Sequence, residues 1–191
     1  MISLNQQNRK LNEYSLSFFL KGEKMELFIS EAEIEDAAMI INYLNQVGGE
    51  SNFLQFGQDE CLLNEFEEME VIQDYIEQDN SLLLLGFIED ELVSMLSIQG
   101  EKQDRLKHIG HFAITVKKDY WNMSIASMMM EEMLEMIRNT SLEILDLEVR
   151  SDNRNAIKLY KKFHFQEIGQ YPQMFKINDH YYDAILMNLY L

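Results

Sequence analysis

Cysteine, proline and basic residues are scarce in this sequence, and the shortages of cysteine and of positive charge each exclude a class of protein. Cys61 is the only cysteine among 191 residues, so no disulfide can form within the chain, as is usual in reducing compartments. Asp and Glu number 33 against 16 Lys and Arg, which gives a formal net charge of −17. Because nucleic acids and anionic membranes bind basic surfaces, this charge argues against both as partners and permits a cationic one.

Long apolar runs are also missing, and the first residues lack the pattern of a signal peptide. Apolar runs such as residues 82–85 and 128–130 are far too short to span a bilayer. Residues 1–24 do not show the charged start, apolar centre and small-residue end of a secretory signal. We therefore predict a cytoplasmic protein.

The residues before Met25 suggest a different origin for the N-terminal segment. Residues 21–25, KGEKM, can be back-translated as AAA GGA GAA AAA ATG, which contains a bacterial ribosome-binding sequence before a start codon. Our hypothesis is that Met25 is the biological start and that residues 1–24 are an N-terminal extension, a translated leader. Residues 25–191 then form a single domain that is long enough to bury a sizeable core.

From Met25 onward the sequence alternates between strand and helix patterns. No repeat, low-complexity segment or linker interrupts it, and 47% of the residues are hydrophobic. The turns at Glu89-Asp90 and Asn178-Asp179 are expected to close two hairpins. The expected strands are residues 26–30, 81–88, 91–98, 108–116, 142–149, 165–177 and 181–191, and the expected helices are residues 34–44, 64–78, 125–137 and 155–163. This order predicts an α/β protein with a sheet of mixed strand direction.

A turn without glycine joins the predicted strand 108–116 to the helix 125–137. Turns of this kind that hold a phosphate usually carry glycines, yet residues 121–126 read WNMSIA. A helix N-terminus offers unpaired N–H groups and a favourable dipole to an anion. Ser124, Ala126 and Ser127 are small enough to let a phosphate approach the backbone. From these residues alone, the turn is either an anion site or an ordinary helix start.

A more specific motif lies in residues 147–165, LEVRSDNRNAIKLYKKFHF. Its pattern resembles the GNAT superfamily of N-acetyltransferases, in which an Asn is followed by Ala, then Leu-Tyr, then Lys-x-Gly-Phe. The matching residues are Asn153, Ala156, Leu159, Tyr160, Lys162 and Phe165, and His164 replaces the glycine. The resemblance spans about residues 25–191. It implies a largely antiparallel central sheet of mixed direction, flanked by helices on both faces.

The resemblance also assigns a role to the glycine-free turn. The family's second signature, Arg/Gln-x-x-Gly-x-Gly/Ala, falls on Trp121, Ser124 and Ala126, of which only the last matches fully. It implies acetyl-CoA as co-substrate and no metal. Backbone groups near Ile114 and Val116 would then pair with the pantetheine arm. The residues expected to hold the pyrophosphate are Trp121, Asn122, Met123, Ser124, Ala126 and Ser127.

Three further residues have roles implied by the same resemblance. Asn153 would bond the pantetheine or anchor its own turn, and Tyr160 would protonate the leaving thiolate. His111 lies near the position where several related sequences have a glutamate, so it is our candidate for the base that deprotonates the amine, directly or through water. A hydrogen-bonded core histidine is the alternative for His111. A tyrosine that only fills the crevice between strand and helix is the alternative for Tyr160.

Residues 58–79 carry nine carboxylates and no Lys or Arg. In the implied fold this segment forms one wall of the acceptor groove and would attract a cationic amine, although a solvated helix face would look similar. We therefore predict an N-acetyltransferase that acts on a small cationic amine or a protein amine. The alternative is a degenerate GNAT-fold protein that binds CoA or a protein partner without efficient catalysis. A homodimer through the C-terminal strands is left open.

Overall fold

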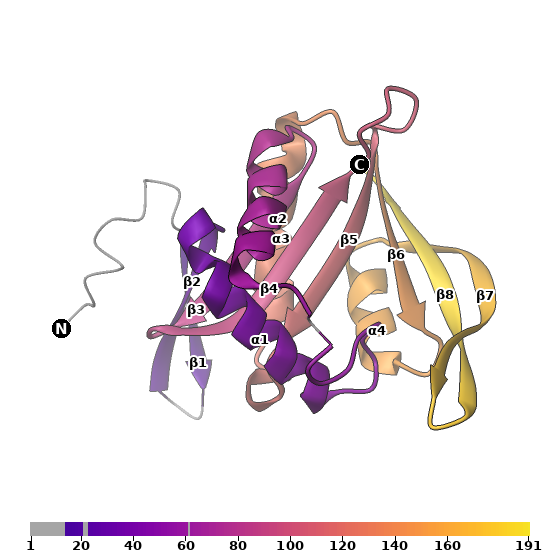
Figure 1. Cartoon of the computed structure of the whole chain (residues 1–191), viewed down its shortest axis with the longest axis horizontal. Helices are drawn as coiled ribbons and strands as arrows, with labels where there is room; N and C mark the ends of the chain where they lie inside the picture. Colours follow the sequence, from indigo (N-terminus) through magenta and orange to yellow (C-terminus); the bar gives the residue numbers. More distant parts are fainter. Residues whose placement is uncertain (1–13, 21–22, 61) are drawn as a thin grey trace.

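A single eight-stranded sheet organises the protein in the computed structural model, which describes residues 14–20, 23–60 and 62–191 (Figure 1). The strands are β1 (Tyr14–Leu20), β2 (Glu23–Glu31), β3 (Leu82–Ile88), β4 (Glu91–Gly100), β5 (Ile109–Val116), β6 (Ile144–Arg150), β7 (Gln166–Ile177) and β8 (His180–Tyr190). The α-helices are α1 (Ala37–Glu50), α2 (Glu65–Glu77), α3 (Ile125–Met136) and α4 (Arg154–Lys162), and short 3-10 helices are η2 (Ile34–Asp36), η3 (Lys118–Tyr120) and η4 (Ile137–Asn139). The sheet order is β1-β2-β3-β4-β5-β6-β8-β7.

Helices cover both faces of the sheet, and strand β3 shows why. Its run of leucines is buried throughout, and alternate side chains point to opposite faces. Leu84 belongs to the core under α3 and α4, together with Met129 of α3. Leu83 and Leu85 belong to the second core, together with Ile40 of α1. The predicted α/β class with a mixed, largely antiparallel sheet is therefore confirmed, because among the strands that the structure describes only β5 and β6 pair in parallel.

Both predicted hairpin turns are confirmed. Ile88 pairs with Glu91 across the first turn, and Ile177 pairs with His180 across the second. Asn178 and Asp179 both have positive φ angles, 48° and 62°, as a two-residue hairpin turn with the right-handed strand twist requires. No helix within the described residues is long and apolar enough to cross a membrane.

Strand β1 precedes every element that we expected. It pairs antiparallel with β2, from Tyr14 opposite Ile29 to Leu20 opposite Glu23. The proposed start at Met25 remains a prediction, and residues 1–13 and 21–22 of the proposed leader lie outside the described residues. In the full chain, β1 therefore adds one edge strand to the sheet of the predicted domain, next to β2.

The central strands β5 and β6 diverge, and this divergence positions the site described below. β4 pairs with β5 along the whole of β5, from Gly100 opposite Gly110 to Ser94 opposite Val116. β6 pairs with β5 only from Ile109 to His111. Beyond His111, the β6-facing edge of β5 has no strand partner among the described residues.

Candidate functional site

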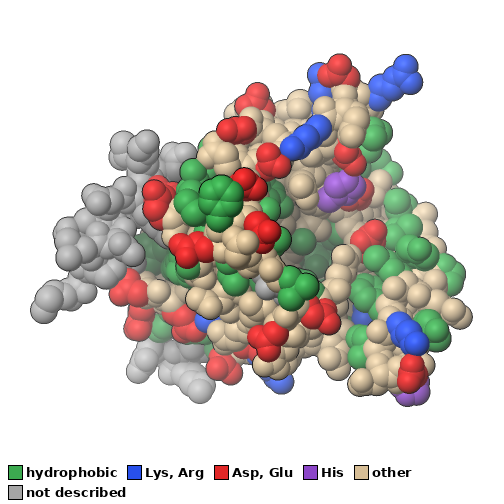
Figure 2. Space-filling view, viewed as in Figure 1, with side chains coloured by type: hydrophobic (Ala, Val, Ile, Leu, Met, Phe, Trp, Pro, Cys, Tyr) green, Lys and Arg blue, Asp and Glu red, His purple; other side chains and the backbone are tan. Residues whose placement is uncertain are grey.

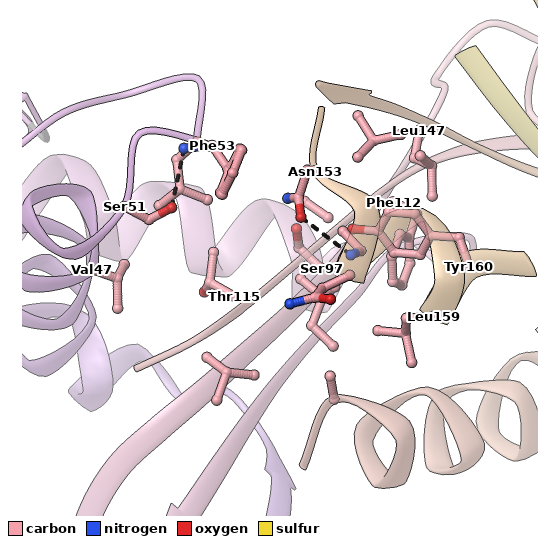
Figure 3. Close-up of a pocket in the computed structure, with 18 of the residues that line it drawn as sticks. Val47, Ser51, Phe53, Ser97, Phe112, Thr115, Leu147, Asn153, Leu159 and Tyr160 are labelled. Atoms are coloured by element: carbon pink, nitrogen blue, oxygen red, sulfur yellow. Dashed lines mark hydrogen bonds between the residues drawn. The ribbon is translucent and has the colours of Figure 1, made fainter. Parts of the chain in front are cut away.

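A cavity of about 780 Å³ opens where β5 and β6 separate. Its walls come from β4, β5, the turn after β5, the first turn of α3, strand β6, helix α4 and the loop after α1 (Figure 3). Figure 3 shows Ser51 and Phe53 of that loop on the opposite side of the cavity from Leu159 and Tyr160 of α4. In the space-filling view, this face of the molecule is hollowed between α1 and the β6 side (Figure 2).

The predicted site residues gather around this cavity, although they come from four separate segments. Met123 is the exception, because its partly buried side chain packs against the core. The predicted residues that line the cavity are His111, Ile114, Val116, Trp121, Asn122, Ser124, Ala126, Ser127, Asn153 and Tyr160. The structure therefore brings both predicted motifs to one site.

The glycine-free turn adopts the backbone shape that glycine favours. Asn122 and Ser124 have φ angles of 63° and 64°, in the left-handed region. Ser124 is the N-cap of α3, but its side chain makes no capping hydrogen bond. Among the described residues, the N–H groups of residues 122–127 have no acceptor. The N–H of Met128 donates to Ser124 O at 3.0 Å. The N–H groups of residues 122–127 are therefore available to an anion at the wall of the cavity.

The open edge of β5 leads directly into this turn. Ile144 N–H donates to His108 O at 3.0 Å, and Glu101 N–H donates to Ile109 O at 3.2 Å. The backbone N–H and C=O groups of the even-numbered residues of β5 therefore point towards β6. Beyond the point where the strands diverge, these include the backbone groups of Ile114. Val116 faces the same way, but its carbonyl already accepts a hydrogen bond from Trp121 Nε1 at 2.7 Å.

Tyr160 reaches the cavity from helix α4 and is held by aromatic neighbours. Its ring centroid lies 6.0 Å from that of Phe112, edge to face, and 5.7 Å from that of Phe165. The side chain is 9% exposed, and burial raises its pKa to about 12. Among the described residues, Tyr160 Oη has no hydrogen-bond partner. The phenol therefore remains protonated at neutral pH and can donate its proton to a group in the cavity.

Asn153 begins helix α4 in the way that its motif position suggests. Its Oδ1 accepts a hydrogen bond from Ala156 N–H at 3.2 Å, which caps the helix. This contact corresponds to the turn-anchoring role, one of the two roles left open for Asn153. Its side-chain amide also lines the cavity.

His111 lies between two carboxylates at the rim of the cavity. Its Nδ1 is 2.6 Å from Asp146 Oδ1, and its Nε2 is 3.1 Å from Glu101 Oε1. Partial burial lowers the pKa of His111, but the hydrogen bonds to Glu101 and Asp146 outweigh burial and raise it above its usual value. Both nitrogens are therefore engaged, and the ring carries its proton at a higher pH than a free histidine does.

The acidic wall differs from the one that we expected. Acidic side chains do gather over α1 and α2 (Figure 2). Of the described residues in 58–79, however, only Tyr75 lines the cavity, so the expectation that this segment's carboxylates form the acceptor wall was wrong. The carboxylates that do line it are Glu50, Asp146 and Glu148, and none of the described lining residues is Lys or Arg. Asp146 and Glu148 are two residues apart on β6, directly before the Asn153 motif. This spacing puts both side chains on one face of the strand, and it could have predicted that they line the cavity.

Comparison with protein families and known proteins gives a consistent result. Residues 53–165 match the family described as "Acetyltransferase (GNAT) family". The L-amino acid N-acetyltransferase AaaT of Escherichia coli (strain K12) is 34% identical over 105 residues, which are 54% of this chain. The match spans 65% of AaaT, less than two thirds of its length.

Two solved structures show similar folds. A GNAT-family acetyltransferase from Streptococcus pneumoniae has a TM-score of 0.83 and 31% identity, covering 86% of this chain and 99% of its own. The structure of yncA from Salmonella typhimurium, solved with its cofactor acetyl-CoA, has a TM-score of 0.75 and 14% identity, covering 86% and 94%. At this lower identity the similarity concerns the fold alone.

Proposed function

Because the chain belongs to the acetyltransferase (GNAT) family, we propose that it transfers the acetyl group of acetyl-CoA to a primary amine, in the cytoplasm. One observation carries the proposal: the unpaired edge of β5 leads directly into the free N–H groups of residues 122–127, along one cavity that also contains Tyr160. An extended strand edge suits an amide-bearing arm, and a helix N-terminus suits a pyrophosphate.

The residues present fit acetyl-CoA, which supplies a thioester as the acetyl donor. Backbone groups of Ile114 would pair with the pantetheine arm, whereas Val116 O would first have to release Trp121. The turn of residues 121–127 would hold the pyrophosphate, and its left-handed backbone at Ser124 supplies the shape that a family glycine would. Asn153 would bond the arm through its side-chain amide while its Oδ1 caps α4.

Tyr160 would act as the general acid. Its neutral phenol lines the cavity and has no competing hydrogen bond among the described residues. We assign it the protonation of the departing thiolate sulfur.

His111 would act as the base for the amine, with Asp146 as its orienting partner. The shorter contact keeps a proton on Nδ1, facing Asp146. With the proton kept on Nδ1, loss of the second proton leaves Nε2 without a hydrogen to donate to Glu101. Nε2 would then release Glu101 and be free to accept a proton. The acidic partners thus orient the ring and shift the pH at which it acts.

The acceptor that we propose is a cationic amine, either a small polyamine-like molecule or a lysine side chain. The lining carboxylates and the lack of Lys and Arg among the described lining residues support it. A free amino acid, the substrate class in the name of AaaT, would bring a carboxylate to a site whose described lining residues include no Lys or Arg. Tyr75 and Phe53 provide apolar surface for the methylene chain of such an amine.

The test is release of free thiol from acetyl-CoA with spermidine, a lysine-containing peptide and several L-amino acids. We expect turnover with the cationic amines and little with the amino acids. Preference for the amino acids would contradict the acceptor assignment. A thermal shift with acetyl-CoA but no thiol release would favour the alternative, a degenerate member of the family. Acetyl-CoA at 100 times its Kd should stabilise the protein by about 2.7 kcal/mol.

We also propose a homodimer through the C-terminal strands, a possibility that the sequence leaves open. β7 forms the edge of the described sheet opposite β1, and its Ile168 and Tyr171 are exposed. Such an edge can pair with a second copy. A monomeric mass in sedimentation at assay concentrations would contradict this proposal.

A further inference from the structure

Arg150, the last residue of β6, is a buried cation with every side of its guanidinium engaged. Its side chain is 6% exposed. Nε and Nη2 donate to the two oxygens of Asp152 at 2.9 and 2.6 Å, and Nη1 donates to Asn52 O at 2.6 Å. The guanidinium carbon lies 4.7 Å from the ring centroid of Phe53 and 3.9 Å from that of Tyr182. A planar, stacked and bidentate arrangement of this kind suits arginine and not lysine.

Two of these contacts fall on the loop of residues 51–56, which lines the cavity opposite α4 and would face the acceptor amine in the proposed function. Among the described residues, only two hydrogen bonds join this loop to another element. One is the bond from Arg150 to Asn52 O, and the other runs from Gln55 Nε2 to Glu148 Oε2 at 2.9 Å. Glu148 and Arg150 are two residues apart and lie on the same face of β6. One strand face therefore holds a loop that is nearly a hundred residues away in sequence.

We propose that Arg150 is a positioning residue for the acceptor amine. Through Asn52 and Phe53 it holds the loop of residues 51–56 against β6, and so sets the width of the cavity where the amine enters. The proposal rests on the proposed acetyltransferase function. Loss of the side chain would free the loop but leave the turn of residues 121–127 and the edge of β5 unchanged, because Arg150 contacts neither.

One hydrogen bond at the N-terminus of α4 involves the main chain of Arg150 and not its side chain. Asn153 N–H donates to the main-chain carbonyl of Arg150 at 2.9 Å, and a substitution retains that bond. Substitution of Arg150 should therefore act mainly on amine binding, and little on acetyl-CoA binding. This separation distinguishes a positioning role from a general loss of structure.

The experiment compares Arg150→Lys and Arg150→Gln with wild type, and uses Arg138→Gln as a matched control. Arg138 is an exposed arginine paired with Glu135, outside the cavity. We expect KM for the amine to rise about tenfold in Arg150→Gln, as expected when a charged hydrogen bond and its stacking are lost. Arg150→Lys should recover only part of this loss, and the Kd for acetyl-CoA should change less than about twofold. The control should match wild type.

Hydrogen exchange on the full chain provides a second readout that does not need turnover. In Arg150→Lys, amides of residues 51–57 should exchange faster, while those of β3 and β4 keep their protection. An unchanged amine KM and unchanged exchange in this loop would overturn the proposal. An equal rise in amine KM and acetyl-CoA Kd would overturn it as well. If wild type releases no thiol with any amine, the proposed function fails, and loop exchange still decides whether Arg150 holds the loop.

Discussion

At the scale of single residues, Ser124 and His164 occupy the two positions where the matching family motifs have glycine. Both have left-handed backbone, with φ angles of 64° and 68°. His164 follows the end of α4, where its N–H donates to Lys161 O and Phe165 N–H donates to Tyr160 O, the two bonds of a Schellman motif. The absence of glycine therefore leaves the backbone conformation in place and raises its energy.

Ser124→Gly should stabilise the protein and preserve or tighten acetyl-CoA binding. Relief of the left-handed conformation outweighs the extra freedom of the unfolded chain, and we expect a gain of about 0.5–1 kcal/mol in unfolding free energy. Chemical denaturation and an acetyl-CoA titration measure the two effects. His164→Gly is the matched control, with a similar stability gain and unchanged acetyl-CoA affinity. A large loss of acetyl-CoA affinity in folded Ser124→Gly would count against the phosphate-binding assignment.

Tyr160→Phe should lower kcat by about a hundredfold or more, because the general acid is removed. The ring remains packed against Phe112 and Phe165, so acetyl-CoA affinity and thermal stability should change little. Steady-state kinetics and an acetyl-CoA titration separate these effects. Tyr171→Phe, on an exposed tyrosine of β7, serves as the control. Unchanged turnover would remove Tyr160 from the chemistry and leave it as a packing residue.

At the scale of elements, His111 connects β5, β6 and the end of β4. Asp146 belongs to β6, and Glu101 follows directly after β4. The contacts lie at the last residue pair of β5 and β6 before the strands separate. Because the folded pKa of His111 is raised above its unfolded value, the contribution of these contacts to stability is fully present below the unfolded pKa. It is lost as the pH rises through the folded pKa.

The same shift predicts a pH profile for turnover. If neutral His111 is the base, kcat/KM should rise with pH along an acidic limb of the pH profile. The midpoint of that limb should lie above the usual histidine pKa of about 6.5. Asp146→Asn should move that limb to lower pH, since one of the carboxylates that favour the charged ring is lost. His111→Asn should abolish the limb and lower kcat. An identical limb in wild type and His111→Asn would exclude His111 as the base.

At the scale of the whole molecule, the cavity and strand β1 lie in different parts of the sheet. β1 forms one edge of the sheet (Figure 1). The cavity lies where β5 and β6 separate. Leu16 and Phe18 of β1 are partly buried against the core under α3. We therefore expect strand β1 to affect stability more than it affects the site.

A chain that begins at Met25 should fold and bind acetyl-CoA as the full chain does, with an unfolding free energy lower by about 1–3 kcal/mol. The loss reflects the apolar contacts of Leu16 and Phe18 and the exposed edge of β2. Denaturation and acetyl-CoA titration of both chains provide the comparison. The mass of the protein made from its native locus tests the start itself, and a chain beginning at Met1 would refute the leader hypothesis.

Much of the fold followed from local patterns. The hairpin turns, the helix α3 and the capped start of α4 depend on residues close together in sequence, such as Asn153 and Ala156. The residues that form the acidic wall of the cavity did not follow from local patterns. The acidic residues of α2 looked suitable because their charge is uncompensated, but a helix can present such charge to solvent as readily as to a cavity.

The sequence by itself determined the class of fold and the two motifs, because periodicity, capping and small-residue spacing act over a few positions. Which residues would meet an acetyl donor is a prediction that rests on the family resemblance of those motifs. Only the tertiary structure decided the rest. The divergence of β5 from β6, the two carboxylates around His111 and the contact of Arg150 with Asn52, 98 positions apart, all join distant segments. The packing of helices and strands sets such contacts, and no local spacing in the sequence specifies them.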